Sequence, residues 1–247
     1  MNVNFTVSPS FPTERITDWY IFNTWLQRAL SMSIHLELYD DFGSQRKAIL
    51  EGQVDMIYAN PFDASLLVRE RNFQAIAGPE SGDEMVVFTA AEKPFQSITD
   101  LRPGVRLSCT DDPSVNTVGR ILLEPADIDP ADIVTLPTDT YIQVARMVLR
   151  DNADIGFMPV DAFEALSGII RRDLHVLVTS QLHVIHHSFL IGPALLDSRE
   201  KIAELLVTLH ETEKGGSLLA GLGCNRWRRL EHEDVELMID IISTLTQ

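Results

Sequence analysis

Hydrophobic residues recur along the first 71 residues in two spacings, one typical of short buried strands and the other of helices with a single apolar face. The pattern predicts three strands, at 5–7, 34–38 and 54–58. It predicts helices after each of them, at 18–30, 45–50 and 61–71. A chain that alternates strand and helix in this way favours a mainly parallel sheet covered by helices.

A second α/β unit follows a strand expected at 85–89. Its further strands are predicted at 105–109, 133–136, 155–158 and 174–179, and its helices at 118–123, 141–149 and 161–166. A last strand is expected at 184–191, and the pattern is then wholly helical, at 199–213, 217–222 and 233–245. No third sheet accounts for these last helices, so they are expected to return to the first unit.

This order predicts two lobes, one built from residues 1–85 and 190–247 and the other from residues 86–189. The two strands that cross between the lobes would form a hinge around Met85 to Val87 and His187 to Phe189. Open α/β sheets bind ligands at the carboxyl ends of their strands, so the expected ligand site is the cleft between the lobes.

Composition narrows the classes of function. A chain of 247 residues with 45% hydrophobic residues can bury a real core, and no apolar run approaches the length of a membrane-spanning helix. The net charge of −16 argues against a nucleic-acid partner, because basic side chains must replace the counterions of a phosphate backbone. A small anion is still compatible with this charge, because its binding depends on local donors.

The first thirty residues carry no secretory pattern. Two alternatives stay open: a cytoplasmic protein, or a periplasmic or extracytoplasmic one whose export signal has been removed ahead of Met1. The two cysteines, Cys109 and Cys224, have no metal-ligand spacing, and we expect no disulfide between them.

The segment DPSVNT at 112–117 lies between a predicted strand and the helix expected from Val118. Ser114, Asn116 and Thr117 are residue types that cap helix ends, and Pro113 suits a first turn. The free N–H groups and the positive end of the helix dipole make such a terminus suitable for an anion. Taken alone, an ordinary helix cap is the simpler interpretation.

Over nearly its whole length the chain resembles the substrate-binding proteins of phosphate, phosphite and phosphonate ABC transporters. The similar segments are AILEGQVD at 48–55, FQSITDLRPG at 95–104, DPSVNT at 112–117, IDP at 128–130 and DNADIG at 151–156. None is specific alone, but their order and spacing together are. The resemblance implies the two-lobed type II periplasmic-binding-protein fold, with two mainly parallel sheets, helices on both faces and a two-strand hinge.

The resemblance also implies a set of residues that bind a small oxyanion. Ser114 matches the family's anion loop, whereas Val115, Asn116 and Thr117 depart from its Ser-Thr-Ser-Gly pattern, and Tyr141 stands where a histidine is common. Asn116, Thr117 and Tyr141 can still donate hydrogen bonds. The first lobe is expected to add Tyr58, Asn60, Ser8 and Ser10. These departures leave phosphonate specificity open, because a carboxylate or sulfonate would fit as well.

The function expected from this resemblance is capture of a phosphonate- or phosphate-like oxyanion for an ABC transporter, by a monomer without cofactor or catalysis. Two alternatives stay open: a ligand-sensing domain of a signalling system, and a cofactor-biosynthesis enzyme on the same fold. No catalytic motif supports the enzyme. His183, His186 and His187 suggest a metal, but they would not converge from one strand, and we expect none.

Overall fold

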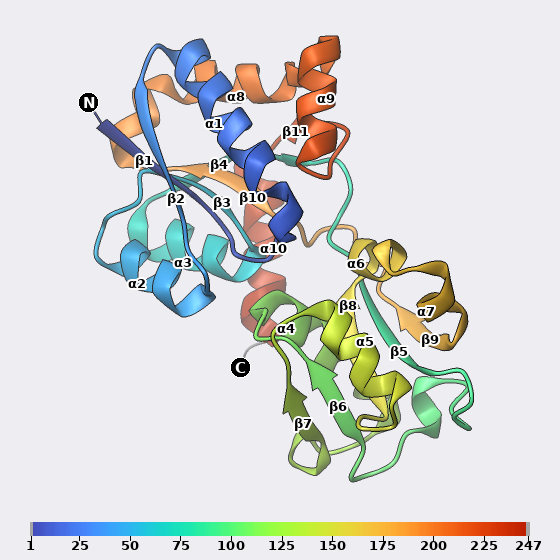
Figure 1. The fold of residues 1–247 in the computed structure, drawn as a ribbon. Helices are drawn as coiled ribbons and strands as arrows, with labels where there is room; N and C mark the ends of the chain where they lie inside the picture. The colour runs from blue at the N-terminus through green and yellow to red at the C-terminus, as the bar shows by residue number, and fades with distance from the viewer. Residues whose placement is uncertain (1, 246–247) are drawn as a thin grey trace. The chain divides into compact units, whose positions relative to one another are not determined.

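The computed structural model describes residues 2–245; Met1, Thr246 and Gln247 lie outside the described part. The chain divides into two compact units. Unit one contains the described residues up to Gly82 together with Val184–Thr244, and unit two contains Asp83–His183. Each unit has its own sheet and its own core (Figure 1).

Unit one is built on a six-stranded sheet of order β11-β4-β10-β3-β1-β2. Its strands are β1 (Asn2–Val7), β2 (Ser33–Leu38), β3 (Met56–Ala59), β4 (Gln74–Pro79), β10 (Ser188–Ile191) and β11 (Trp227–Arg229). Its helices are α1 (Ile16–Leu30), α2 (Phe42–Leu50), α3 (Pro61–Arg71), α8 (Arg199–Val207), α9 (Glu213–Gly221) and α10 (His232–Leu245). The first four strands run in one direction, and β10 and β11 are antiparallel to their neighbours.

Helices cover both faces of this sheet (Figure 1). Alternate residues of the central strands point to opposite faces, so Met56 and Phe189 join one apolar cluster while Ile57 and Leu190 join the other. Side chains of α1, α8 and α9 complete the first cluster, and side chains of α2, α3 and α10 complete the second. Burial on both faces is the reason that β3 and β10 read as continuous apolar runs.

Unit two has a five-stranded sheet of order β7-β6-β8-β5-β9. Its strands are β5 (Met85–Ala90), β6 (Arg106–Cys109), β7 (Val134–Pro137), β8 (Ile155–Pro159) and β9 (Leu174–Thr179). Its helices are α4 (Pro113–Leu122), α5 (Tyr141–Leu149), α6 (Val160–Ala165) and α7 (Gly168–Arg172). β6, β7 and β8 are parallel, and β5 runs antiparallel to both β8 and β9.

One face of this sheet packs on α5, α6 and α7 through a cluster that contains Phe88, Val144 and Met158. On α4, Gly119 lies so close to the ring of Phe157 that an added Cβ would come within 2.3 Å of it. Short 3-10 helices complete the two units, at Thr13–Arg15, Ile98–Asp100, Glu124–Ala126, Pro130–Asp132, Pro193–Ser198 and Leu209–Glu211.

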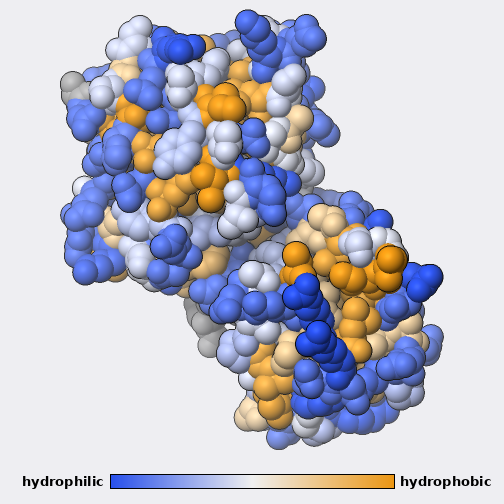
Figure 2. All heavy atoms as spheres, in the orientation of Figure 1, coloured by the Kyte–Doolittle hydropathy of each residue, from blue (hydrophilic) through white to orange (hydrophobic). Residues whose placement is uncertain are grey.

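The surface mixes polar and apolar residues. Figure 2 shows hydrophilic side chains around separate apolar patches on the visible face of each unit. Tyr20, Ile21 and Ile142 are among the large exposed apolar side chains, and scattered residues of this kind are normal on a folded protein. Within residues 2–245, no helix has both the length and the apolar character that a bilayer crossing requires.

Several predicted elements differ from the structure. The helix expected at 199–213 ends at Val207, and the helix expected at 217–222 is α9, which begins at Glu213. The strand expected at 184–191 contains only Ser188–Ile191, because the residues before it form an irregular connection. The helix expected at 118–123 begins five residues earlier, at Pro113. β4 and β11 were missed altogether. Cys109 and Cys224 are both free thiols, as expected.

Candidate functional site

The carboxyl ends of β1 and β3 bring together the candidate residues of unit one. β1 and β3 are parallel, so their carboxyl ends lie at the same edge of the sheet. Ser8 and Ser10 follow β1 there, while Tyr58 is the last residue but one of β3 and Asn60 directly follows that strand. β10 runs the opposite way and begins at this same edge, with Ser188 opposite Ala59.

Ser8 and Asn60 are joined in a buried polar network. Asn60 caps α3: its Oδ1 accepts a hydrogen bond from the Asp63 backbone N–H at 2.9 Å. Its amide nitrogen donates to Ser8 Oγ and to Asp63 Oδ2, both at 2.7 Å. Arg46 Nε then donates to Asp63 Oδ1 at 2.8 Å. These bonds hold the edge of the sheet in shape, and they use every hydrogen-bonding group of the Asn60 amide.

Tyr58 belongs to an aromatic stack at this edge. Its ring lies nearly parallel to the ring of Trp227, with centroids 5.6 Å apart, and 5.4 Å from the imidazole of His187. Ser10 Oγ is 2.9 Å from His187 Nε2. Trp227 comes from β11, which the sequence pattern did not indicate, so its place beside Tyr58 was missed. The edge therefore combines a packed group of aromatic rings with the hydroxyl of Ser10.

In unit two, the strand β6 ends at Cys109 and leads into α4. Asp112 caps this helix; its Oδ1 accepts the backbone N–H groups of Ser114 at 2.9 Å and Val115 at 3.3 Å. The sequence pattern assigns the cap of this helix to the three polar residues that follow Asp112. That assignment is wrong, because Ser114, Asn116 and Thr117 lie inside α4 and the carboxylate ahead of them takes the N-cap position.

Two of these three side chains bond to the backbone nearby. Asn116 Nδ2 donates to the Thr110 carbonyl, and Thr117 Oγ1 donates to the Pro113 carbonyl, each at 2.8 Å. Ser114 differs from both. The residue is only 2% exposed, and its hydroxyl has no hydrogen-bond partner within the described residues 2–245. A buried hydroxyl without a partner loses its hydration without compensation, so Ser114 remains the candidate ligand donor of α4.

Tyr141 opens α5, as predicted, and Thr140 caps that helix. The Tyr141 hydroxyl donates to Asp112 Oδ2 at 3.1 Å and so joins the α5 terminus to the α4 terminus. Burial, and secondly the negative charge of Asp112, raise the pKa of the Tyr141 phenol well above its usual value. The phenol therefore stays protonated, and it acts as a hydrogen-bond donor across the physiological range.

Asp154 lies away from these residues, ahead of β8. It forms ion pairs with Lys93 and Arg106, and these partners lower its pKa to about 2, with the Arg106 hydrogen bond as the main cause. The carboxylate ties β6 to β8 through the Arg106 backbone N–H as well. Asp154 is thus a structural residue.

The three histidines serve separate contacts. The imidazole of His183 is 3.4 Å from Glu84, whereas His186 Nδ1 is 3.2 Å from Ser188 Oγ. Among residues 2–245 there is no group of three or more histidine, cysteine, aspartate or glutamate side chains that could hold a metal ion.

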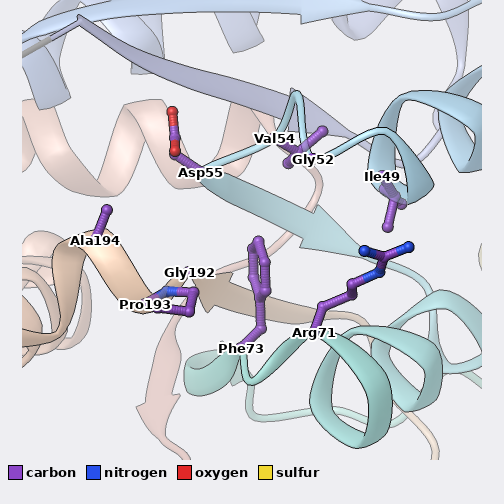
Figure 3. Close-up of a pocket in the computed structure, with 9 residues that line it drawn as sticks. All are labelled: Ile49, Gly52, Val54, Asp55, Arg71, Phe73, Gly192, Pro193 and Ala194. Carbon is purple, nitrogen blue, oxygen red and sulfur yellow. The ribbon is translucent and has the colours of Figure 1, made fainter.

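A separate cavity of about 320 Å³ lies in unit one, at the amino end of β3 (Figure 3). None of the candidate residues lines it. Asp55 accepts a hydrogen bond from the Asn4 backbone N–H, and Arg71 donates to the Leu50 carbonyl. Both charged side chains of this cavity therefore have structural contacts, and we do not place the ligand there.

Comparison with known proteins identifies one family. Residues 5–235 match the family model described as "ABC transporter, phosphonate, periplasmic substrate-binding protein". No curated protein matches the chain.

Three solved structures illustrate the likeness in fold. PhnD1 from Prochlorococcus marinus, in complex with methylphosphonate, has a TM-score of 0.85 at 10% identity and covers 99% of this chain and 98% of its own. A binding protein component of an ABC phosphonate transporter from Pseudomonas aeruginosa has a TM-score of 0.77 at 14% identity and covers 100% and 89%. The aliphatic sulphonate binding protein SsuA from Escherichia coli has a TM-score of 0.69 at 14% identity and covers 99% and 91%. At these identities the likeness concerns the fold, and it confirms the predicted type II periplasmic-binding-protein fold.

Proposed function

The chain belongs to the family of periplasmic substrate-binding proteins of phosphonate ABC transporters, and on this premise we propose that it captures a small oxyanion of the phosphonate or phosphate type. Solute binding is the role of the family. What the proposal adds is the chemical class of the solute and the residues that contact it.

The observation that carries the proposal is the unpartnered hydroxyl of Ser114. It is buried on the first turn of α4, where the backbone N–H groups of Ser114 and Val115 and the protonated phenol of Tyr141 all donate to Asp112. Donors in a site of low dielectric bind an anion strongly, because charge-assisted hydrogen bonds are about twice as strong as neutral ones. In unit one, Ser10 and Tyr58 would add a hydroxyl and an aromatic surface.

Asn116, Thr117, Ser8 and Asn60 have a lesser part in the proposal. Asn116, Thr117 and Asn60 already donate within their own units, so a ligand would have to replace those bonds, and the Ser8 hydroxyl accepts a hydrogen bond from Asn60. Such an exchange gains little free energy, because one good hydrogen bond is lost for each one formed.

The family is one of transport proteins and not of enzymes. We therefore propose binding without catalysis, by a monomer that delivers its solute to an ABC permease. A family described as periplasmic lies outside the cytoplasm, so an export signal cleaved ahead of the chain is part of the proposal. Closure of the two lobes on the ligand also stays a prediction.

A thermal-shift screen tests the proposal. Purified protein is heated with methylphosphonate, phosphate, phosphite, alkylsulfonates or small carboxylates, each at the same concentration. A ligand at a hundredfold excess over its Kd stabilises the folded state by about 2.7 kcal/mol. A shift with a phosphorus oxyanion supports the proposal, and a shift with carboxylates alone contradicts it.

A further inference from the structure

The side chain of Asp112 places a carboxylate of the protein itself at the N-terminus of α4. Its Oδ1 accepts the first two free N–H groups of the helix, from Ser114 and Val115. Its Oδ2 accepts the Tyr141 hydroxyl at 3.1 Å. Three donors that an incoming oxyanion would use are therefore directed at one carboxylate of the chain itself.

The environment of Asp112 keeps this carboxylate in place. The residue is only 4% exposed, and Thr110 and Ser114 beside it are buried as well. The positive end of the helix dipole favours a negative group in this position. An oxyanion approaching the same terminus meets a like charge at close range, where water screens it poorly.

A second observation is that the Asp112 cap does not satisfy every donor at the N-terminus of α4. The N–H of Ser114 donates to Asp112, but the hydroxyl of the same residue is buried and has no acceptor in the described part of the chain. The carboxylate thus satisfies the backbone donors but not the side-chain donor next to them. This is the arrangement expected where a built-in anion and a ligand share one terminus.

We propose that Asp112 is a specificity-determining residue, whose carboxylate competes with oxyanion ligands for the N-terminus of α4. This inference rests on the proposed function, since it concerns the same donors and the same class of ligand. Removal of the carboxylate frees the N–H groups of Ser114 and Val115 and takes away the repulsion. Affinity for an oxyanion then rises.

Two substitutions separate the charge from the occupied space. Asp112→Ser removes both the charge and most of the side chain, whereas Asp112→Asn removes the charge and keeps the size, with one oxygen that can accept from Ser114 and an NH2 group in place of the oxygen that accepts from Tyr141. Serine and asparagine cap helices about as well as aspartate, so α4 is retained in both variants. Asp111→Asn is the matched control, because Asp111 is exposed, carries the same charge and caps no helix.

The experiment is isothermal titration of the wild-type chain and the three variants with methylphosphonate and, separately, with inorganic phosphate. We expect Asp112→Ser to bind at least tenfold more tightly than the wild type, with Asp112→Asn between them and Asp111→Asn unchanged. Thermal unfolding of each variant confirms that it is folded, and Asp112→Asn decides the result if the serine variant is not.

The outcomes distinguish this inference from the proposed function. If the wild type binds and the Asp112 variants bind no more tightly, the inference is wrong and the proposed function stands. If only the Asp112 variants bind, the inference stands and oxyanion capture by the natural chain is refuted. If no protein binds either probe, both are wrong. An equal gain in Asp111→Asn would assign the effect to net charge and overturn the inference.

Discussion

Ser114→Ala is the sharpest test of the proposed ligand contact, because it removes a single oxygen that has no hydrogen-bond partner among residues 2–245. The residue is 2% exposed, and its backbone N–H, which donates to Asp112, is unaffected by the change. Alanine is also well tolerated within a helix. The substitution therefore removes one donor and leaves the helix cap intact.

The structure sets the expected size of two effects. A hydrogen bond to a charged group contributes about 1.5–3 kcal/mol, so loss of the hydroxyl weakens oxyanion binding about 10- to 150-fold. Stability moves little or rises, because a buried hydroxyl without a partner costs about 1–3 kcal/mol and alanine removes that cost at the expense of a small void. Affinity and stability are thus expected to change independently.

Ser108→Ala is the matched control. Ser108 is fully buried on β6, and its hydroxyl also has no partner. The stability effect should therefore be similar, while affinity should be unchanged because Ser108 lies within the strand and not at its end. Titration with methylphosphonate gives the affinities, and urea unfolding gives the stabilities.

The reasoning fails if Ser114→Ala binds as tightly as the wild type. It also fails if both alanine variants lose affinity equally, since the loss would then come from a general change in unit two. A large fall in stability for Ser114→Ala alone would mean that the hydroxyl has a structural role.

Three further predictions concern the framework around the candidate residues. Asp154→Asn should lower the free energy of unfolding by about 1–2 kcal/mol at pH 7. This is less than the fall of its pKa to about 2 would give, because its partner Arg106 is 36% exposed and water screens the pair. Since the folded-state pKa is depressed, this stabilisation is present above pH 4 and is lost as the pH falls towards 2, and urea unfolding in that range should show the two proteins converging. Asn60→Ala should lower the free energy of unfolding, measured in urea, by about 2–3 kcal/mol, because it removes the α3 cap and two further buried hydrogen bonds. A loss below about 1 kcal/mol would contradict the hydrogen-bond network of Asn60. Gly119→Ala should lower the thermal midpoint, since a Cβ within 2.3 Å of Phe157 forces the core apart at about 1–3 kcal/mol, and an unchanged midpoint would show that α4 can shift freely.

The sequence predicted helix α3 to the residue because both of its ends carry strong local signals. Asn60 and Pro61 are an N-cap and a first-turn proline, and Asn72 takes the left-handed conformation that ends a helix. β4 had no such signal. Its residues QAIAGP include alanine, glycine and proline, which are poor strand formers, and only pairing with β10 and β11 makes them a strand.

The start of α4 was misjudged for a different reason. Asp111, Asp112, Ser114, Asn116 and Thr117 are all able to cap a helix, and they fall within seven positions. The choice among them depends on tertiary contacts, here the Tyr141 hydroxyl that reaches Asp112 from 29 residues later in the chain. Local propensity cannot contain that contact. The sequence thus predicted that candidate residues gather where β6 leads into α4, but it could not predict the hydrogen bonds that they form.

The number of polar side chains at these edges is a poor guide to affinity. Asn60, Asn116 and Thr117 are all capable donors, yet each donates to a partner within its own unit. A ligand that takes over such a donor breaks one bond to form another, so the net gain is small. Ser114 gains a bond without losing one, and Asp112 decides whether an anion can approach it. On the proposed function and the inference that rests on it, selectivity depends on the contrast between the Ser114 hydroxyl and the carboxylate two residues before it, and substitutions at these two positions should change oxyanion affinity in opposite directions.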